Sequence, residues 1–144
     1  MTKRAICWIG RFAGNNGYAT VTRAMFNLIG SNYECVGIDI NTRDVFGQRI
    51  PGLEVIEQDD NVQVLFPQDY TVTSVIHETL DNWKCVEFDG KTCVTGYTVA
   101  ETSLLPLDWQ KNITAANRVW TASEFNRQIF KKHTPFPLDL VYHP

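Results

Sequence analysis

The 144-residue sequence predicts a single α/β domain of the Rossmann-like type, with a mainly parallel sheet, helices on both faces and a β-hairpin elaboration. Short apolar runs typical of buried strands alternate with helical patterns, and this order favours a parallel sheet. The first strand, helix and strand fit within about 40 residues, as a right-handed βαβ unit does. The sequence shows no internal repeat, low-complexity tract or interdomain linker, so residues 1–144 are expected to form one domain.

The chain opens with the elements of this βαβ unit. Residues 5–9 (AICWI) are a continuous apolar run, which predicts a strand buried on both faces. A glycine-rich loop over residues 10–17 follows. The next helix is predicted from apolar residues at helical spacing, namely Val21, Ala24, Met25, Leu28 and Ile29. Gly30 would end this helix, and residues 35–40 form a second apolar strand that contains Asp39.

The middle of the chain is less regular. Residues 42–60 are polar and contain two glycines and a proline, so we expect a mostly irregular connection there. Two short apolar runs, at residues 62–66 and 72–76, predict further strands. The second of these runs leads directly into His77 and Glu78.

The last third of the chain again alternates strands and helices. Residues 93–100 predict a strand that ends in a carboxylate, Glu101. A short amphipathic helix and a strand at residues 118–122 follow, and Ser123 is a good N-cap for another helix. The predicted core-facing stripe of that helix consists of Phe125, Ile129 and Phe130. The last strand is expected at residues 138–142.

The four cysteines form no CxxC pair and have no histidine at zinc-finger spacing, so no metal site is expected. Cys85 and Cys93 flank Asp89-Gly90, a dipeptide typical of hairpin turns, so residues 83–93 predict an antiparallel hairpin. The two thiols would then lie near each other across the strands. Without a signal peptide we favour free thiols, and a disulfide remains the alternative.

Composition and charge exclude several classes of protein. A net charge of −3 offers no basic face for nucleic acid. No apolar run approaches the ~18 residues of a membrane span. The first apolar run has about six residues, which is short for the ~7–15 residues of a signal sequence. We therefore expect a cytoplasmic protein.

The loop over residues 10–17 joins the first strand to the first helix, where glycines allow a ligand close to the backbone and helix N–H groups attract phosphate. Gly10, Gly14 and Gly17 are spaced four and three apart, so they do not match G-x-G-x-x-G, and there is no Walker A pattern. A tight structural turn and a ligand-binding loop both remain open from the residues alone.

Two further groups of side chains follow predicted strands, and ligands of open α/β sheets bind outside the carboxyl ends of strands. Glu101, with Thr102 and Ser103 behind it, would accept hydrogen bonds from hydroxyl groups without a metal. His77 belongs to the residue type most easily poised near neutral pH. The alternatives are structural, since Ser and Thr often satisfy loop backbone. We take His77 and Glu101 as candidate catalytic residues.

One stretch carries a family resemblance. Glu101 closes a strand, Leu-Pro and Trp109 precede a helix, and a Val-Trp strand runs into Ser123-Glu-Phe-Asn. This arrangement resembles the N-terminal half of retaining GT-B glycosyltransferases, of the family 4-like type, and the resemblance extends from about Gly14 to His143. It implies the acceptor-side domain of an enzyme that moves a hexosyl group from a nucleotide sugar to a glycan or lipid-linked acceptor.

The resemblance also implies where ligands bind. Its glycine-rich loop approaches the donor phosphate or the acceptor, and the matching positions are Gly14, Asn15, Asn16 and Gly17. Glu101, Thr102 and Ser103 complete the expected substrate-binding set. Such transferases need neither cofactor nor metal, and a C-terminal domain holds most of the nucleotide-sugar contacts. Residues 1–144 are therefore expected to be inactive alone and to self-associate through the surface left exposed.

Two other functions remain open. One is a non-catalytic α/β binding or assembly module that uses the same edge of the sheet. The other is the nucleotide-binding Rossmann domain of an oxidoreductase. Asp39 lies where a ribose-binding acid would sit in such a domain, although the glycine pattern counts against it.

Overall fold

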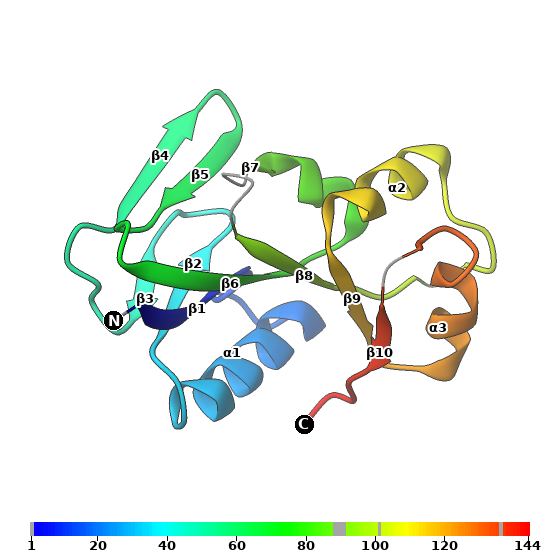
Figure 1. Ribbon diagram of the computed structural model, residues 1–144. Coiled ribbons are helices and arrows are strands. Elements are labelled where there is room, and N and C mark those ends of the chain that lie inside the picture. Colours follow the sequence, from blue (N-terminus) through cyan, green and yellow to red (C-terminus); the bar gives the residue numbers. More distant parts are fainter. Residues whose placement is uncertain (1, 88–91, 101, 136) are drawn as a thin grey trace.

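The structure is a computed structural model that describes residues 2–87, 92–100, 102–135 and 137–144. The fold is α/β, and its main sheet has seven strands in the order β10-β9-β8-β6-β1-β2-β3 (Figure 1). These strands are β1 (Lys3–Gly10), β2 (Cys35–Asp39), β3 (Val45–Gly47), β6 (Tyr70–His77), β8 (Cys93–Tyr97), β9 (Arg118–Thr121) and β10 (Leu138–Leu140). All pairs are parallel except that of β3 with β2. The predicted Rossmann-like fold class is confirmed.

The register of the central strands brings their carboxyl ends together. Gly10 of β1 is opposite both Asp39 of β2 and His77 of β6, and His77 is opposite Tyr97 of β8. Four strands therefore end in one row, as a parallel sheet with in-register pairing requires. The chain that leaves each of these ends contributes to the same edge of the sheet.

Helices cover both faces of the main sheet, as expected. Helix α1 (Gly17–Gly30) lies on one face, where its core includes Trp8, Phe12, Met25, Val75 and Tyr97. The other face is covered by the 3-10 helices η1 (Leu80–Cys85) and η2 (Ile113–Ala115) and by α2 (Leu107–Asn112) and α3 (Glu124–Phe130). That second core includes Ile9, Ile38, Ile76, Leu80, Ile113 and Phe130. Figure 1 shows α1 below the main sheet and η1 with α2 above it.

A second, three-stranded sheet consists of β4 (Glu54–Gln58), β5 (Asn61–Leu65) and β7 (Val86–Glu87). Residues 42–60 are mostly irregular, as expected, apart from the short strands β3 and β4. The small sheet corrects one prediction. The antiparallel hairpin lies at β4–β5 and not at residues 83–93, because β7 pairs with β5 and β8 pairs with β6 and β9. Residues 88–91, which include the expected turn, lie outside the described residues.

The helix α3 begins as predicted, with Ser123 Oγ accepting a hydrogen bond from the N–H of Asn126 at 3.2 Å. Its core-facing stripe is partly different. Phe125 is 55% exposed, whereas Asn126 is buried and exchanges hydrogen bonds of 3.2 and 2.5 Å with the backbone of Ala100. In the same way α1 buries Thr22, and the predicted core residue Leu28 is exposed. A buried side chain that satisfies backbone groups can replace an apolar one on a helix face.

All four cysteines are free thiols, with Cys7 and Cys35 buried and Cys93 exposed. Within the described ranges, no helix is long and apolar enough to cross a membrane.

Candidate functional site

A cavity of about 330 Å³ lies at the carboxyl edge of the main sheet. Its lining comes from the first turn of α1, the end of β6, the chain after β8 and the C-terminal segment, and consists of Gly17, Tyr18, Val21, His77, Val99 and His143. None of these lining residues is a carboxylate, a lysine or an arginine. The cavity is therefore apolar with a few neutral polar groups, which is the usual composition of small-molecule sites.

His77 is the buried polar residue of this cavity, with 3% of its surface exposed. Its ring stacks on Tyr97, with centroids 4.7 Å apart, and meets the edge of Trp8 at 5.7 Å. Nδ1 lies 2.7 Å from the hydroxyl of Thr22 in α1. Burial, and secondarily the nearby His143, lowers the pKa of His77 to about 3. The imidazole is therefore neutral at neutral pH and offers hydrogen bonds, not a proton from an imidazolium.

The C-terminal segment closes one side of the cavity. Tyr97 donates its hydroxyl proton to the carbonyl of Val141 at 2.6 Å, and the ring of His143 meets that of Tyr97 at 5.9 Å. Partial burial lowers the pKa of His143. The sequence does not show that residues 77 and 143 meet, because only the pairing of β10 beside β9 brings this segment to the edge.

Three buried polar atoms have no hydrogen-bond partner in the described part of the chain, and two of them belong to rings that contact His77. These are Trp8 Nε1, Tyr18 Oη and Thr98 Oγ1. The Tyr18 hydroxyl faces Thr98, and burial raises its pKa. Buried polar groups are nearly always paired with protein, water or ligand. Because Tyr18 lines the cavity, its hydroxyl suits bound water or a ligand hydroxyl group.

The loop over residues 10–17 is shaped by Asp39, which is 1% exposed. One carboxylate oxygen accepts from the N–H groups of Phe12 and Ala13 at 2.8 and 3.1 Å. The other accepts from those of Asn41 and Thr42, both at 2.8 Å. Burial alone would raise the pKa of Asp39, but the four backbone donors outweigh it and hold the pKa below 3.8. Both oxygens are thus engaged by the protein's own backbone.

Replacing Asp39 by Asn should cost about 2–3 kcal/mol of unfolding free energy, because the new amide group faces backbone donors it cannot accept from. Chemical denaturation at pH 7 measures this loss. Asp44→Asn is the matched control, since Asp44 is an exposed residue just before β3. A loss below 1 kcal/mol for Asp39→Asn would show that the loop does not depend on this carboxylate.

The four predicted loop positions have different roles. Gly14 has φ of +91°, which favours glycine, and its carbonyl accepts a hydrogen bond from Arg23 at 2.9 Å. Asn16 caps α1 by accepting from the N–H of Ala19 at 2.9 Å, and Asn15 is exposed. Gly17 alone of the four lines the cavity. The structure therefore brings Gly17 and His77 together and gives Asn16 a capping role.

Arg11 and Glu78 form a pair that the sequence analysis missed. Glu78 is 0% exposed, and its two oxygens accept from Arg11 Nε at 2.6 Å and Nη2 at 2.9 Å. The carboxylate also accepts from the backbone and hydroxyl of Thr79, at 2.9 and 3.1 Å. The pair joins the loop after β1 to the end of β6, and the Arg11 guanidinium lies 5.9 Å from the Tyr18 ring centroid. Arg11 follows the end of β1 and Glu78 follows the end of β6, two strands that pair side by side. Their positions at neighbouring strand ends were the sequence signal that could have indicated this ion pair.

The second predicted group is not brought to the cavity in the described residues. Glu101 itself lies outside the described residues. Thr102 and Ser103 are exposed, and the Thr102 hydroxyl donates to the carbonyl of Leu104 at 2.8 Å. Thr102 therefore satisfies its own loop, which is the structural alternative considered for it.

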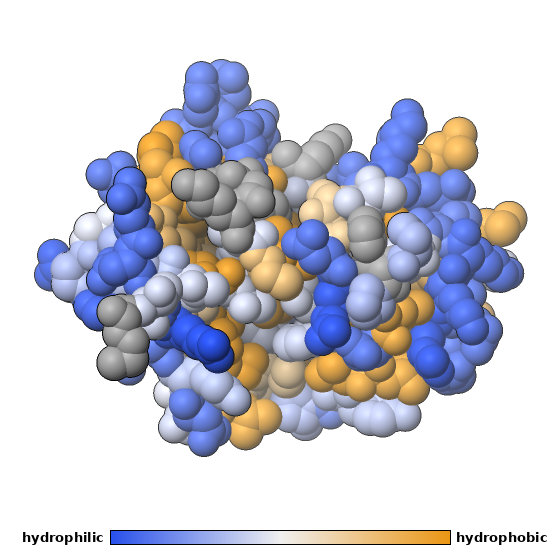
Figure 2. All heavy atoms as spheres, in the orientation of Figure 1, coloured by the Kyte–Doolittle hydropathy of each residue, from blue (hydrophilic) through white to orange (hydrophobic). Residues whose placement is uncertain are grey.

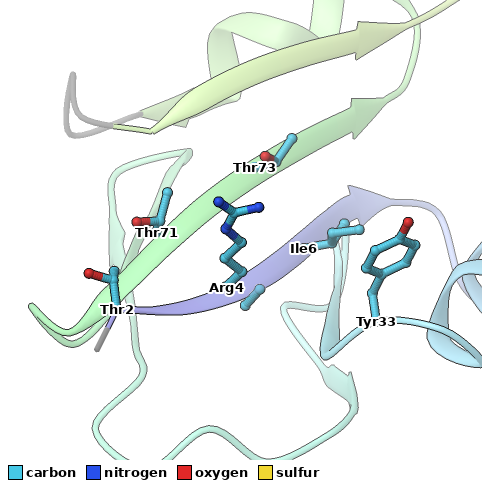
Figure 3. Close-up of a pocket in the computed structure, with 7 residues that line it drawn as sticks. Thr2, Arg4, Ile6, Tyr33, Thr71 and Thr73 are labelled. Atoms are coloured by element: carbon cyan, nitrogen blue, oxygen red, sulfur yellow. The ribbon is translucent and has the colours of Figure 1, made fainter.

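A larger hollow, of about 510 Å³, lies on the face of the sheet near the amino ends of β1 and β6. Figure 3 shows Arg4 reaching across the sheet toward Thr73, between Thr71 and Ile6. Its lining, which also includes Thr2 and Tyr33, is mostly exposed, and it holds one charged group. No group of three His, Cys, Asp or Glu side chains that could hold a metal occurs among the described residues.

Comparisons with known proteins give no relative for this chain. No family model matches it, and neither the curated proteins nor the solved structures contain a significant match.

Proposed function

We propose that residues 1–144 form the acceptor-side domain of a retaining GT-B glycosyltransferase, which moves a hexosyl group from a nucleotide sugar to a glycan or lipid-linked acceptor. The observation that carries this proposal is the cavity at the carboxyl edge of a Rossmann-like sheet. Its lining has aromatic, aliphatic and neutral polar groups, which suit an uncharged polyhydroxyl ligand. The proposed enzyme acts in the cytoplasm.

In this proposal His77 hydrogen-bonds a sugar hydroxyl. Its Nδ1 is engaged by Thr22, so the sugar hydroxyl would meet Nε2. A neutral imidazole orients a hydroxyl without adding charge. Tyr18, Val21 and Val99 supply the apolar walls against which a sugar ring packs.

In this proposal the nucleotide-sugar donor approaches the cavity from the side of the loop over residues 10–17. Gly17 begins α1, whose N-terminal N–H groups favour a phosphate. The nucleotide is expected to bind mainly to a C-terminal domain, so residues 1–144 alone should not catalyse transfer. Transfer requires groups aimed at the charge that develops on the leaving diphosphate.

Binding of a nicotinamide dinucleotide is the less favoured use of this fold. The acid at the end of the second strand of such domains binds the ribose hydroxyls. Here Asp39 is buried, and its oxygens accept four backbone N–H groups.

The proposal is tested by NMR of the ¹⁵N-labelled chain with a panel of mono- and oligosaccharides and nucleotide sugars. We expect saccharides to shift the amide signals of Gly17, Tyr18 and Val99, and Tyr18→Ala to weaken this binding about tenfold. Tyr33→Ala, at an exposed tyrosine away from the cavity, is the matched control and should bind normally.

Two results would contradict the proposal. Saccharides that leave the cavity signals unchanged while a nicotinamide dinucleotide shifts them would favour an oxidoreductase domain. Sugar transfer by residues 1–144 alone would contradict the assignment of catalysis to a second domain.

A further inference from the structure

A second pocket, of about 280 Å³, lies between η1 and α2. It is lined by Asp81, Pro106, Asp108, Trp109, Lys111 and Asn112. Asp81 comes four residues after His77, and Pro106 precedes α2 on the chain that leaves β8. The pocket therefore follows the same two strand ends as the cavity, but it shares no lining residue with it.

The pocket is held by packed elements. Asn112 donates from its side chain to the carbonyl of Leu80 at 2.7 Å, and Leu80 is 0% exposed. This bond fastens α2 to η1. Trp109 is half-buried and packs against the main core, so one part of its indole is fixed while another part faces the pocket. Sites built on such elements hold their geometry better than sites on loops.

The polar lining limits the charge of a ligand. Asp81 and Asp108 only accept hydrogen bonds, whereas the Lys111 ammonium only donates them. The two carboxylates oppose an anion, and the lysine opposes a cation. A neutral ligand with many hydroxyl groups satisfies both kinds of partner at once.

The remaining features limit its shape. An indole beside polar groups suits a ring that has one apolar face and a polar rim. The volume is just below the range of about 300–1,000 Å³ for drug-sized ligands, so it fits a single ring. Leu104 and Leu107, on either side of Pro106, are 77% and 74% exposed. Figure 2 shows apolar side chains standing out from hydrophilic surroundings on the side where α2 lies.

We propose that this pocket binds one pyranose ring of a neutral saccharide, with the ring packed on Trp109 and its hydroxyl groups bonded to Asp81, Asp108 and Lys111. The inference is argued from this pocket alone and goes beyond the proposed transferase. If both hold, the pocket receives a further ring of the acceptor glycan.

The test is an NMR titration of the ¹⁵N-labelled chain with neutral disaccharides and trisaccharides. Binding is read at the indole N–H of Trp109 and, in the Trp109 variants, at the backbone amides of Asp81 and Asn112, which also line the pocket. Asp81→Asn and Asp108→Asn keep the packing and should each weaken binding about three- to tenfold. Trp109→Ala should abolish it, and Trp109→Phe should retain part of it. Asp44→Asn, an exposed acid elsewhere, should bind as the unmodified chain does.

The variants distinguish this inference from the proposed function. If Tyr18→Ala weakens saccharide binding and the Asp81 and Asp108 variants do not, the saccharide site at Trp109 is contradicted and the acceptor site at the His77 cavity is supported. If the Asp81 and Asp108 variants weaken binding and Tyr18→Ala does not, the site at Trp109 is supported and the acceptor site at the cavity is contradicted. Absence of saccharide binding at Trp109, or binding there of tetramethylammonium or inorganic phosphate instead, would overturn the inference.

Discussion

The unfolding free energy should fall by about 1.4 kcal/mol for each pH unit below about 6.5, and His77→Gln should remove most of this slope. The folded protein holds His77 with a pKa of about 3, because the ring is buried among Trp8, Tyr97 and Tyr18. In the unfolded chain the same ring takes up a proton near pH 6.5. Between these values the unfolded state binds more protons, so this contribution is complete above pH 6.5 and is lost as pH falls toward 3.

Urea unfolding at several pH values from 7.5 to 4.5 measures the slope, and imidazole ¹⁵N shifts report the charge of His77 directly. His143→Gln is the matched control, since it removes the smaller cause and leaves the burial of His77 unchanged. It should keep most of the slope. An imidazolium at position 77 at pH 5 would contradict the neutral role assigned to this residue in the cavity.

Arg11→Met should lower the unfolding free energy by about 3–5 kcal/mol, because it leaves the Glu78 carboxylate buried without its cation. Glu78 is 0% exposed, and two of its hydrogen bonds come from Arg11. The double variant Arg11→Met/Glu78→Gln removes both charges and should lose less than Arg11→Met alone. Chemical denaturation of the two single variants and the double variant gives the coupling energy.

The matched control for this cycle is Lys3→Met, since Lys3 and Asp69 form an exposed ion pair at 3.6 Å. Exposed pairs contribute about 0–1 kcal/mol, so this variant should be nearly neutral. If Arg11→Met lowers the unfolding free energy by no more than Lys3→Met does, the Arg11–Glu78 pair is solvated in solution. The loop would then not be fixed to the end of β6.

The sequence predicted most strands of the main sheet, because buried parallel strands appear as short continuous apolar runs. The run at residues 5–9 and that at residues 72–76 lie within β1 and β6, which pair along their whole length. In the small sheet the run at residues 62–66 predicts β5, but β4 has no such signal. Residues of β4 are mostly exposed, so its strand depends on pairing with β5 and not on an apolar face. Polar composition alone therefore predicted an irregular segment.

The 3-10 helix η1 illustrates the same limit. Leu80 and Trp83 are three residues apart and both are buried, a spacing that suits one face of a short helix. The Asp89-Gly90 dipeptide suggested a hairpin instead. Val86 and Glu87 pair with β5, which is distant in sequence, and this nonlocal pairing decides the conformation.

What the sequence determined by itself is the αβ order, the glycine loop before α1 and the position of His77 at a strand end. These features rest on apolar periodicity and backbone freedom, which are properties of consecutive residues. Three contacts depend on the tertiary structure. Asp39 accepts hydrogen bonds from the backbone of the loop over residues 10–17, and Arg11 neutralises Glu78. Tyr18 and His143 line the same cavity as His77. Each of these contacts joins segments far apart in the chain, so burial and hydrogen-bond satisfaction in the folded state select them, and no local pattern records them.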